Sequence, residues 1–199
     1  MHIESIEQLR TLYGVAKERA LKKEMASLDV HCRRFIALSP FIVIGSGDSA
    51  GQLDASPRGG VPGFVKVLDD HTILIPDSAG NNRLDTLENI LSKKEVGMLF
   101  LIPGMDETLR VNGVASLHTD IQYLERCASE LKPPKLVIKV RVQQAYLHCA
   151  KAFMRSKLWE VSSQIDRKAM PTMNEMIGEQ TGINSETQEE TFKRYLSEL

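Results

Sequence analysis

Two polar segments of the chain combine arginine and serine side chains with glycines at short spacing. Residues 54–60 have the sequence Asp-Ala-Ser-Pro-Arg-Gly-Gly, and residues 75–85 have the sequence Ile-Pro-Asp-Ser-Ala-Gly-Asn-Asn-Arg-Leu-Asp. A guanidinium binds phosphate through two parallel N–H donors, and small residues leave backbone N–H groups open to an anion. The two segments therefore predict a site for an anionic ligand such as a nucleotide phosphate.

The first segment offers a hydroxyl, a fixed turn, a guanidinium and flexible backbone, from Ser56, Pro57, Arg58 and Gly59. A tight surface turn is the alternative interpretation of the same residues. Two β-like runs follow, and a hairpin formed by them would bring the two segments to the same end of a barrel. The expected proximity of the two segments strengthens the prediction of an anion site.

The second segment leads into a predicted helix that has Asp85 in its first turn. Asn81 or Asn82 is a candidate N-cap, and Arg83 would lie at the helix start. Unpaired N–H groups and the helix dipole favour negative charge there, so the segment is suited to phosphate. The alternative is ordinary capping, with Arg83 paired only to Asp85 or Glu88.

A third basic cluster lies at residues 148–159, with the sequence His-Cys-Ala-Lys-Ala-Phe-Met-Arg-Ser-Lys-Leu-Trp. In a helical turn, Lys151, Arg155 and, less closely, Ser156 would share a face. A solvated basic edge with Trp159 in the core is the alternative. The sequence gives neither the histidine nor the cysteine of this cluster a partner for a hydrolytic dyad.

The five histidines of the chain also lack the spacing of metal ligands, so no metal site is predicted.

Hydrophobic patterning predicts a mainly β fold with peripheral helices. The runs that predict strands are residues 41–44, 63–68, 72–75, 96–102, 108–117 and 135–143. Helical spacing is found at residues 4–38, 84–91, 120–131 and 187–196. Because the helices between the strands are short, a six-stranded antiparallel barrel is favoured over a doubly wound parallel sheet. In the fifth predicted strand, Thr108 and Arg110 share the polar face.

Composition narrows the class of protein. The chain has 25 basic and 26 acidic residues, so its charge gives no general attraction to nucleic acid or an anionic membrane. No apolar run has the length of a membrane span, and the N-terminus does not resemble a signal peptide, so a cytoplasmic protein is expected. The 3 cysteines lack a Cys-x-x-Cys spacing and are expected to be buried thiols in a reducing compartment.

We expect one main domain with two appendages. Residues 1–38 would form a helical segment that packs on the barrel, residues 39–160 the barrel, and residues 161–199 a helical tail. The tail is polar, and it is expected either to pack on a partner or to be a mobile end.

Five blocks of this sequence, taken in order, resemble the pyridoxamine 5′-phosphate oxidase-like FMN-binding proteins, and more narrowly their uncharacterised bacterial branch. The blocks are Asp-x-Ser-Pro-Arg-Gly, Ile-Pro-Asp-x-x-Gly-Asn-Asn-Arg-x-Asp-Thr-x-x-Asn-Ile, Gly-x-Leu-Phe-Leu-Ile-Pro-Gly, Glu-Thr-Leu-Arg-Val-Asn-Gly and His-Cys-Ala-Lys-Ala-x-x-Arg-Ser-x-Leu-Trp. The resemblance covers roughly residues 30–160. It implies a split β-barrel homodimer that binds FMN at the subunit interface.

The resemblance also assigns residues to parts of the cofactor. Residues of the first two blocks would bind the phosphate and the ribityl chain, namely Ser56, Pro57, Arg58, Gly59, Asn81, Asn82 and Arg83. The backbone around Ile75, Pro76 and Asp77 would lie along the isoalloxazine. Glu107, Thr108 and Arg110 would reach the flavin ring, and Lys151, Arg155 and Ser156 would contact the cofactor across the dimer.

The chain also departs from the oxidase. It has Asn82-Arg83-Leu84 where the oxidase has Ser-Arg-Lys, and Thr108 where the oxidase has glutamine. The resemblance therefore supports flavin binding by this chain better than it supports the oxidase's substrate. The leading hypothesis is an FMN-dependent oxidoreductase with an unknown small-molecule substrate, in which no catalytic acid or base can be named. A non-catalytic protein that stores or senses FMN is the alternative. A third hypothesis is a related barrel that has lost flavin and binds another ligand, such as haem.

Overall fold

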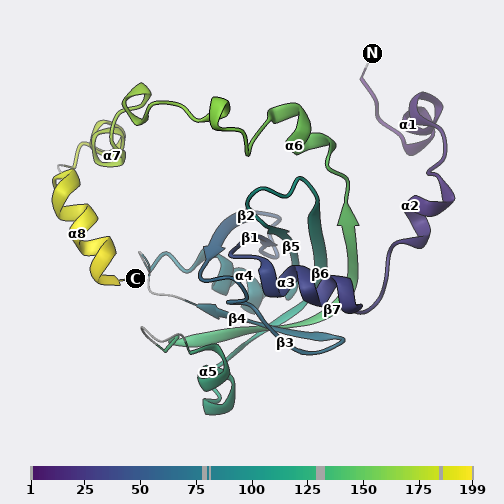
Figure 1. The fold of residues 1–199 in the computed structure, drawn as a ribbon, viewed down its shortest axis with the longest axis horizontal. Coiled ribbons are helices and arrows are strands. Elements are labelled where there is room, and N and C mark those ends of the chain that lie inside the picture. Colours follow the sequence, from purple (N-terminus) through teal and green to yellow (C-terminus); the bar gives the residue numbers. More distant parts are fainter. Residues whose placement is uncertain (1, 78–79, 81, 129–132, 184–185, 199) are drawn as a thin grey trace.

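The computed structural model describes residues 2–77, 80, 82–128, 133–183 and 186–198. Its centre is an antiparallel sheet with the strand order β2-β1-β5-β6-β7-β4-β3 (Figure 1). The strands are β1 (Phe41–Gly47), β2 (Leu53–Gly59), β3 (Lys66–Asp69), β4 (Thr72–Asp77), β5 (Glu95–Leu101), β6 (Thr108–His118) and β7 (Leu136–His148). The mainly β, split-barrel fold class that the sequence predicts is confirmed.

The structure has seven strands in this sheet, whereas the sequence predicts six. The additional strand is β2, which contains the segment expected to be a turn. Its inward positions are polar, because Asp54, Ser56 and Arg58 alternate with exposed residues, and so no apolar run marks it. Pro57 has no N–H to donate, which is tolerated because β2 lies at the edge of the sheet and pairs on one side only.

The core lies inside the curled sheet. Alternate residues of the central strands point inward and are fully buried, among them Ile42, Ile44, Phe100, Val111 and Val140. Burying side chains of this size contributes about 1.5–3 kcal/mol each to folding, which makes this cluster the main source of stability. The rigid frame places the polar side chains of β2 and β4.

β6 and β7 form the longest pairing in the sheet and bend together at a bulge between Asn112 and Gly113. A Cβ at Gly113 would collide with the carbonyl oxygen of Arg141 on β7. Glycine is required here because the two backbones approach too closely for a side chain. The bulge bends the sheet between its two ends.

Three helices pack on the sheet. α3 (Val30–Leu38) buries Cys32, Phe35 and Ile36 against the barrel core. α4 (Asp85–Ser92) buries Leu87 and Ile90 in the same core. α5 (Ile121–Cys127) covers a second, smaller cluster with Leu74 and Val137 at its centre.

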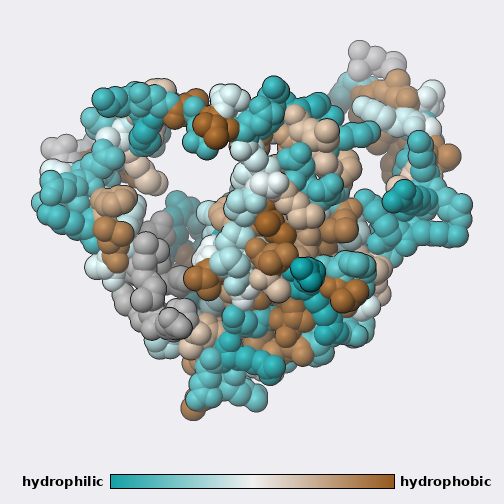
Figure 2. All heavy atoms as spheres, viewed as in Figure 1, coloured by the Kyte–Doolittle hydropathy of each residue, from teal (hydrophilic) through white to brown (hydrophobic). Residues whose placement is uncertain are grey.

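The remaining helices lie in two terminal arms that extend from the barrel (Figure 1). They are α1 (Ile6–Tyr13), α2 (Glu18–Lys22), α6 (Lys151–Ser156), α7 (Met173–Thr181) and α8 (Gln188–Glu198). Neither α1 nor α2 buries a residue, so the part of the N-terminal segment that packs on the barrel consists of α3 and the residues just before it, where Leu28 is buried in the core and Met25 forms a β-bridge with Ala145 on β7. Figure 2 shows apolar side chains on the surface of both arms. Leu12 and Phe192 are among the exposed apolar residues of the chain. In the described part of the chain, no helix is long and apolar enough to cross a bilayer.

Candidate functional site

A cavity of about 540 Å³ opens where β2 faces the end of β4. The start of β7 and the start of α4 complete its wall. Its volume is in the range of small-molecule and cofactor sites. Seven of the residues predicted for cofactor binding line it, namely Ser56, Pro57, Arg58, Gly59, Pro76, Asp77 and Asn82.

Arg58 reaches the cavity because the alternation of β2 turns it inward. Its Nη1 donates to the carbonyl oxygen of Pro57 at 2.9 Å, and its Nη2 lies 3.8 Å from Oδ1 of Asp77 on β4. This ion pair spans the split between two strands that are not neighbours in the sheet. The side chains of Arg58 and Asp77 are only 21% and 16% exposed, so both charges lie in the wall of the cavity.

Asp77 is an unusual neighbour for an anion site. Burial raises the pKa of its carboxyl, and the positive charges of Arg58 and Lys135 oppose that rise. Lys135 lines the same cavity just before β7 begins. The cavity therefore has two cationic side chains facing a carboxylate whose charged form is disfavoured by desolvation.

The loop before α4 differs from the expected capping arrangement. Asn82 and Leu84 both have left-handed backbone, with φ of 59° and 62°. Leu84 occupies the N-cap position and makes no side-chain cap hydrogen bond, so the expectation that Asn82 caps this helix was wrong. Asn81 lies outside the described residues. The two left-handed residues turn the chain sharply into α4 and place Asn82 at the cavity.

Arg83 does not line the cavity. Its side chain is 74% exposed, and its Nε donates to Oδ2 of Asp85 at 2.9 Å. The structure thus contains the Arg83–Asp85 pair of the ordinary capping alternative. Lys135 is the cationic lining residue that the sequence prediction missed, because its position beside β4 follows from the register of β7 and not from any local motif.

The hydroxyl of Ser56 is already engaged by the protein. It donates to the carboxylate of Asp54, which also accepts from Oγ1 of Thr86 at the start of α4. Thr86 lines the cavity as well, and Asp54 lies behind the two hydroxyls. Thr86 was not among the predicted site residues, although the second sequence block contains it.

Of the residues predicted to lie along the flavin ring, Pro76 and Asp77 line the cavity and the others do not. The side chain of Ile75 is fully buried in the core, and the prediction concerned its backbone only. Thr108 at the start of β6 is buried and Glu107 is exposed. Nη1 of Arg110 donates to the hydroxyl of Tyr146 on β7 at 3.0 Å. Among the described residues, none of Glu107, Thr108 and Arg110 lines the cavity.

Further along β7, His148 pairs with Thr108, and its Nε2 is buried without a hydrogen-bond partner among the described residues. Burial lowers the pKa of His148, and the nearby charges of Arg110 and Lys23 lower it further. The end of β7 therefore combines two cations with an imidazole whose protonated form is disfavoured.

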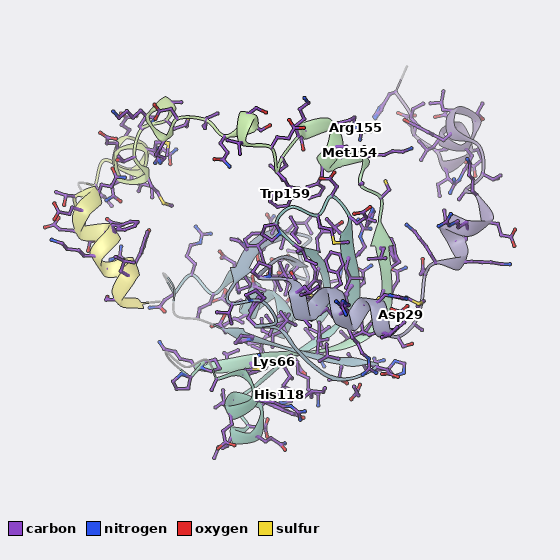
Figure 3. All side chains as sticks on the ribbon, viewed as in Figure 1. Asp29, Lys66, His118, Met154, Arg155 and Trp159 are labelled. Carbon is purple, nitrogen blue, oxygen red and sulfur yellow. The ribbon has the colours of Figure 1, made fainter. Side chains whose placement is uncertain are left out.

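The third cluster forms α6, which follows the end of β7 and lies apart from α4 (Figure 1). Lys151, Arg155 and Ser156 are exposed, and Ser156 donates to the carbonyl of Phe153. Trp159 is half-buried outside the barrel core. It stacks on Phe153 and donates from Nε1 to the carbonyl oxygen of Met105 at 3.0 Å, which holds the segment against the β5–β6 loop (Figure 3).

The fold is a split barrel, and its polar cavity lies in the split. The family model described as pyridoxamine 5′-phosphate oxidase matches residues 28–149. The chain therefore belongs to the pyridoxamine 5′-phosphate oxidase family, as the sequence blocks predict. No curated protein sequence matches the chain.

Three solved structures illustrate the similarity. The HupZ protein from Group A Streptococcus has a TM-score of 0.48 at 17% identity, over 59% of this chain and 90% of that one. An FMN-binding protein of Syntrophomonas wolfei has a TM-score of 0.47 at 15% identity, over 72% and 97%. A protein of Clostridium acetobutylicum related to general stress protein 26 has a TM-score of 0.47 at 8% identity, over 60% and 86%. Family membership itself rests on the sequence match over residues 28–149.

Proposed function

We propose that this protein binds FMN in the cavity between β2 and β4 and acts as an FMN-dependent oxidoreductase on a small-molecule substrate. One observation carries the proposal: the cavity gathers Arg58, Lys135 and Asn82 from three separate parts of the chain, next to the hydroxyls of Ser56 and Thr86. A phosphate needs charge-assisted donors, and a polyhydroxyl chain needs neutral polar partners. Membership of the pyridoxamine 5′-phosphate oxidase family supports the same ligand.

The residues present fit the polar half of FMN. Arg58 and Lys135 would hold the phosphate by charge, and Asn82 would add an amide donor. Asp77 would oppose the phosphate where its carboxyl is ionised, and burial, which raises the pKa of that carboxyl, extends to higher pH the range in which the neutral form avoids this repulsion. When bound, FMN supplies the redox chemistry by accepting or donating hydride, and the protein positions the reactants.

We further propose that the site is completed by a second copy of the chain in a cytoplasmic homodimer. The outward face of the sheet on β1 and β2 includes exposed apolar side chains such as Phe41 and Leu53. Covering that face would favour a dimer through the hydrophobic effect. Lys151, Arg155 and Ser156 of one copy would then contact the cofactor of the other, with residues 39–160 as the flavin-binding domain between a helical N-terminal segment (1–38) and a C-terminal tail (161–199).

The first test is the absorbance spectrum of the purified protein, followed by titration with FMN. We expect flavin absorbance, or quenching of FMN fluorescence with saturation at one FMN per chain. A colourless protein that does not change the spectrum of added FMN would refute the proposal.

Catalysis is tested separately from binding. Anaerobic mixing of the FMN-loaded protein with NADH or NADPH is expected to bleach the flavin if the protein is a nicotinamide-linked reductase. Flavin that stays oxidised with both donors would favour the alternative of a protein that stores or senses FMN. For the dimer, sedimentation at micromolar concentration should give twice the mass of the chain, and a monomer would contradict the interface site.

A further inference from the structure

The carboxylate of Asp54 is the common acceptor for two hydroxyls that line the cavity. Oγ of Ser56 lies 3.0 Å from both carboxylate oxygens, and Oγ1 of Thr86 lies 2.6 Å from Oδ2. Asp54 shares the inward face of β2 with Ser56, while Thr86 comes from α4. Asp54 itself does not line the cavity, so it holds both hydroxyls from behind.

β1 and α4 extend this arrangement. Ser46 on β1 pairs with Asp54 across the strands, and its Oγ lies 3.5 Å from Oδ2 of Asp54. Nδ2 of Asn89 donates to the Oγ of Ser46 at 3.0 Å. Ser46 and Thr86 are buried. Three elements therefore meet at one carboxylate, and packing restricts other rotations of these side chains.

The direction of these hydrogen bonds determines what the cavity wall offers to a ligand. An ionised carboxylate only accepts hydrogen bonds, and a hydroxyl has one hydrogen to donate. Because Ser56 and Thr86 direct that hydrogen at Asp54, the lone pairs of their oxygens remain for the ligand. A phosphate is itself an acceptor and gains nothing from such a wall, whereas the hydroxyls of a polyol can donate to it. Arg58 and Lys135, in contrast, can only donate.

We propose that Asp54 is a positioning residue that makes Ser56 and Thr86 acceptors for the hydroxyl groups of a polyol chain, the ribityl chain in the case of FMN. This inference rests on the proposed function. It separates the cavity into a phosphate end at Arg58 and Lys135 and a polyol end at Ser56 and Thr86. The family resemblance, by comparison, assigns Ser56 to the phosphate and ribityl chain together.

The test compares Asp54→Asn with the wild-type protein in titrations with FMN, riboflavin and lumiflavin. Riboflavin lacks the phosphate, and lumiflavin lacks both the phosphate and the ribityl hydroxyls. The Asn side chain keeps one acceptor oxygen and replaces the other with an N–H₂ donor, so the two hydroxyls lose their charge-assisted acceptor and must share a single neutral oxygen. We expect affinity for FMN and for riboflavin to fall by the same factor, about tenfold, with lumiflavin unchanged.

Two outcomes would overturn the inference. If Asp54→Asn loses affinity for FMN alone, Ser56 lies at the phosphate. If it loses affinity for lumiflavin by the same factor, the role of Asp54 is merely structural. Failure of the wild-type protein to bind FMN would refute the proposed function instead, and it is detected before any variant is made. Asp69→Asn, at the exposed β3–β4 turn, makes the same charge change outside the cavity and should leave all three affinities unchanged.

A second pair of variants keeps the inference testable if Asp54→Asn does not fold. Thr86→Val removes the hydroxyl at nearly constant volume, and Thr86→Ser keeps it. Thr86→Val should weaken FMN and riboflavin equally, by about threefold to tenfold, and Thr86→Ser should restore the affinity. Equal affinities of the Val and Ser variants for riboflavin would contradict the role of this hydroxyl.

Discussion

Two of the regions that contain residues predicted to bind the cofactor differ in how far their side chains are buried and bonded to one another. Around the cavity, side chains of β2, β4 and α4 are part-buried and bonded to one another, as the Arg58–Asp77 and Ser56–Asp54 contacts show. On α6, the charged side chains are exposed, with Lys151 and Arg155 among them. The comparison indicates that one chain suffices to build the phosphate and polyol end of the proposed FMN site. In the proposed site, the second copy would supply the surface at the other end of the cofactor.

Removing Arg58 is expected to have the largest effect. Arg58→Ala deletes a charged partner of the phosphate from a part-buried wall, so FMN affinity should fall roughly 100-fold, or about 2–3 kcal/mol. Riboflavin affinity should change little, because riboflavin has no phosphate. Fluorescence titration with both ligands measures the difference. Arg141→Ala, on the exposed side of β7, is the matched control, and equal FMN affinity of the two variants would place the phosphate elsewhere.

Removing the α6 cations tests the other region. The double variant Lys151→Ala, Arg155→Ala should weaken FMN by about tenfold, because exposed charges contribute less than part-buried ones. The effect should vanish when the protein is diluted until the dimer dissociates, since these side chains would act on the partner's cofactor. Titration at two protein concentrations measures this. Arg167→Ala, Lys168→Ala in the tail removes the same charge and should leave FMN binding unchanged at both concentrations.

The contrast between β5 and β2 explains how much of the fold the sequence can predict. β5 is almost wholly apolar, and hydrophobic patterning located it to within one residue at either end. β2 has Asp54, Ser56 and Arg58 at its inward positions, and a polar inward face gives no hydrophobic signal. Its strand character depends on pairing with β1 and on the bond from Thr86 to Asp54, which lie outside the segment itself.

The site shows the same limit. Local sequence favoured Arg83, which lies at a predicted helix start, and gave no signal for Lys135, which lies beside a predicted strand. The left-handed residues Asn82 and Leu84 set the path of the chain, on which Arg83 is exposed, whereas the pairing of β7 with β4 brings Lys135 to the cavity. The first two block motifs contain residues that line the cavity, but the three-dimensional pairing of strands determines which cationic side chains enter it.

Asp77 permits a smaller test of the charge balance within the cavity. Burial raises the pKa of its carboxyl, and a bound phosphate would raise that pKa further, so binding should favour proton uptake by Asp77. As the pH rises above the ordinary aspartate range near about 4, wild-type Asp77 should ionise and oppose the phosphate. Asp77→Asn should therefore bind FMN about threefold to fivefold more tightly near neutral pH.

The pH dependence separates this effect from others. The ratio of Asp77→Asn to wild-type FMN affinity cancels the titration of the phosphate itself, and this ratio should rise with pH. The same ratio for riboflavin should stay constant. A ratio that falls with pH would show that the Asp77 carboxylate helps to bind FMN and does not oppose it.

The thiols offer the smallest and most local test of the two regions. Burial raises the pKa of Cys32 to about 12 and that of Cys127 to about 11, so both thiols stay protonated and unreactive near neutral pH. Cys149 is exposed at the start of the α6 segment, contrary to the expectation of buried thiols, and should be the fast-reacting one. If α6 borders the cofactor of a partner, FMN should slow the labelling of Cys149 by a disulfide reagent about threefold. Dilution to monomer should abolish this protection. If FMN does not slow the labelling at any protein concentration, the proposed contact between α6 and the cofactor is wrong.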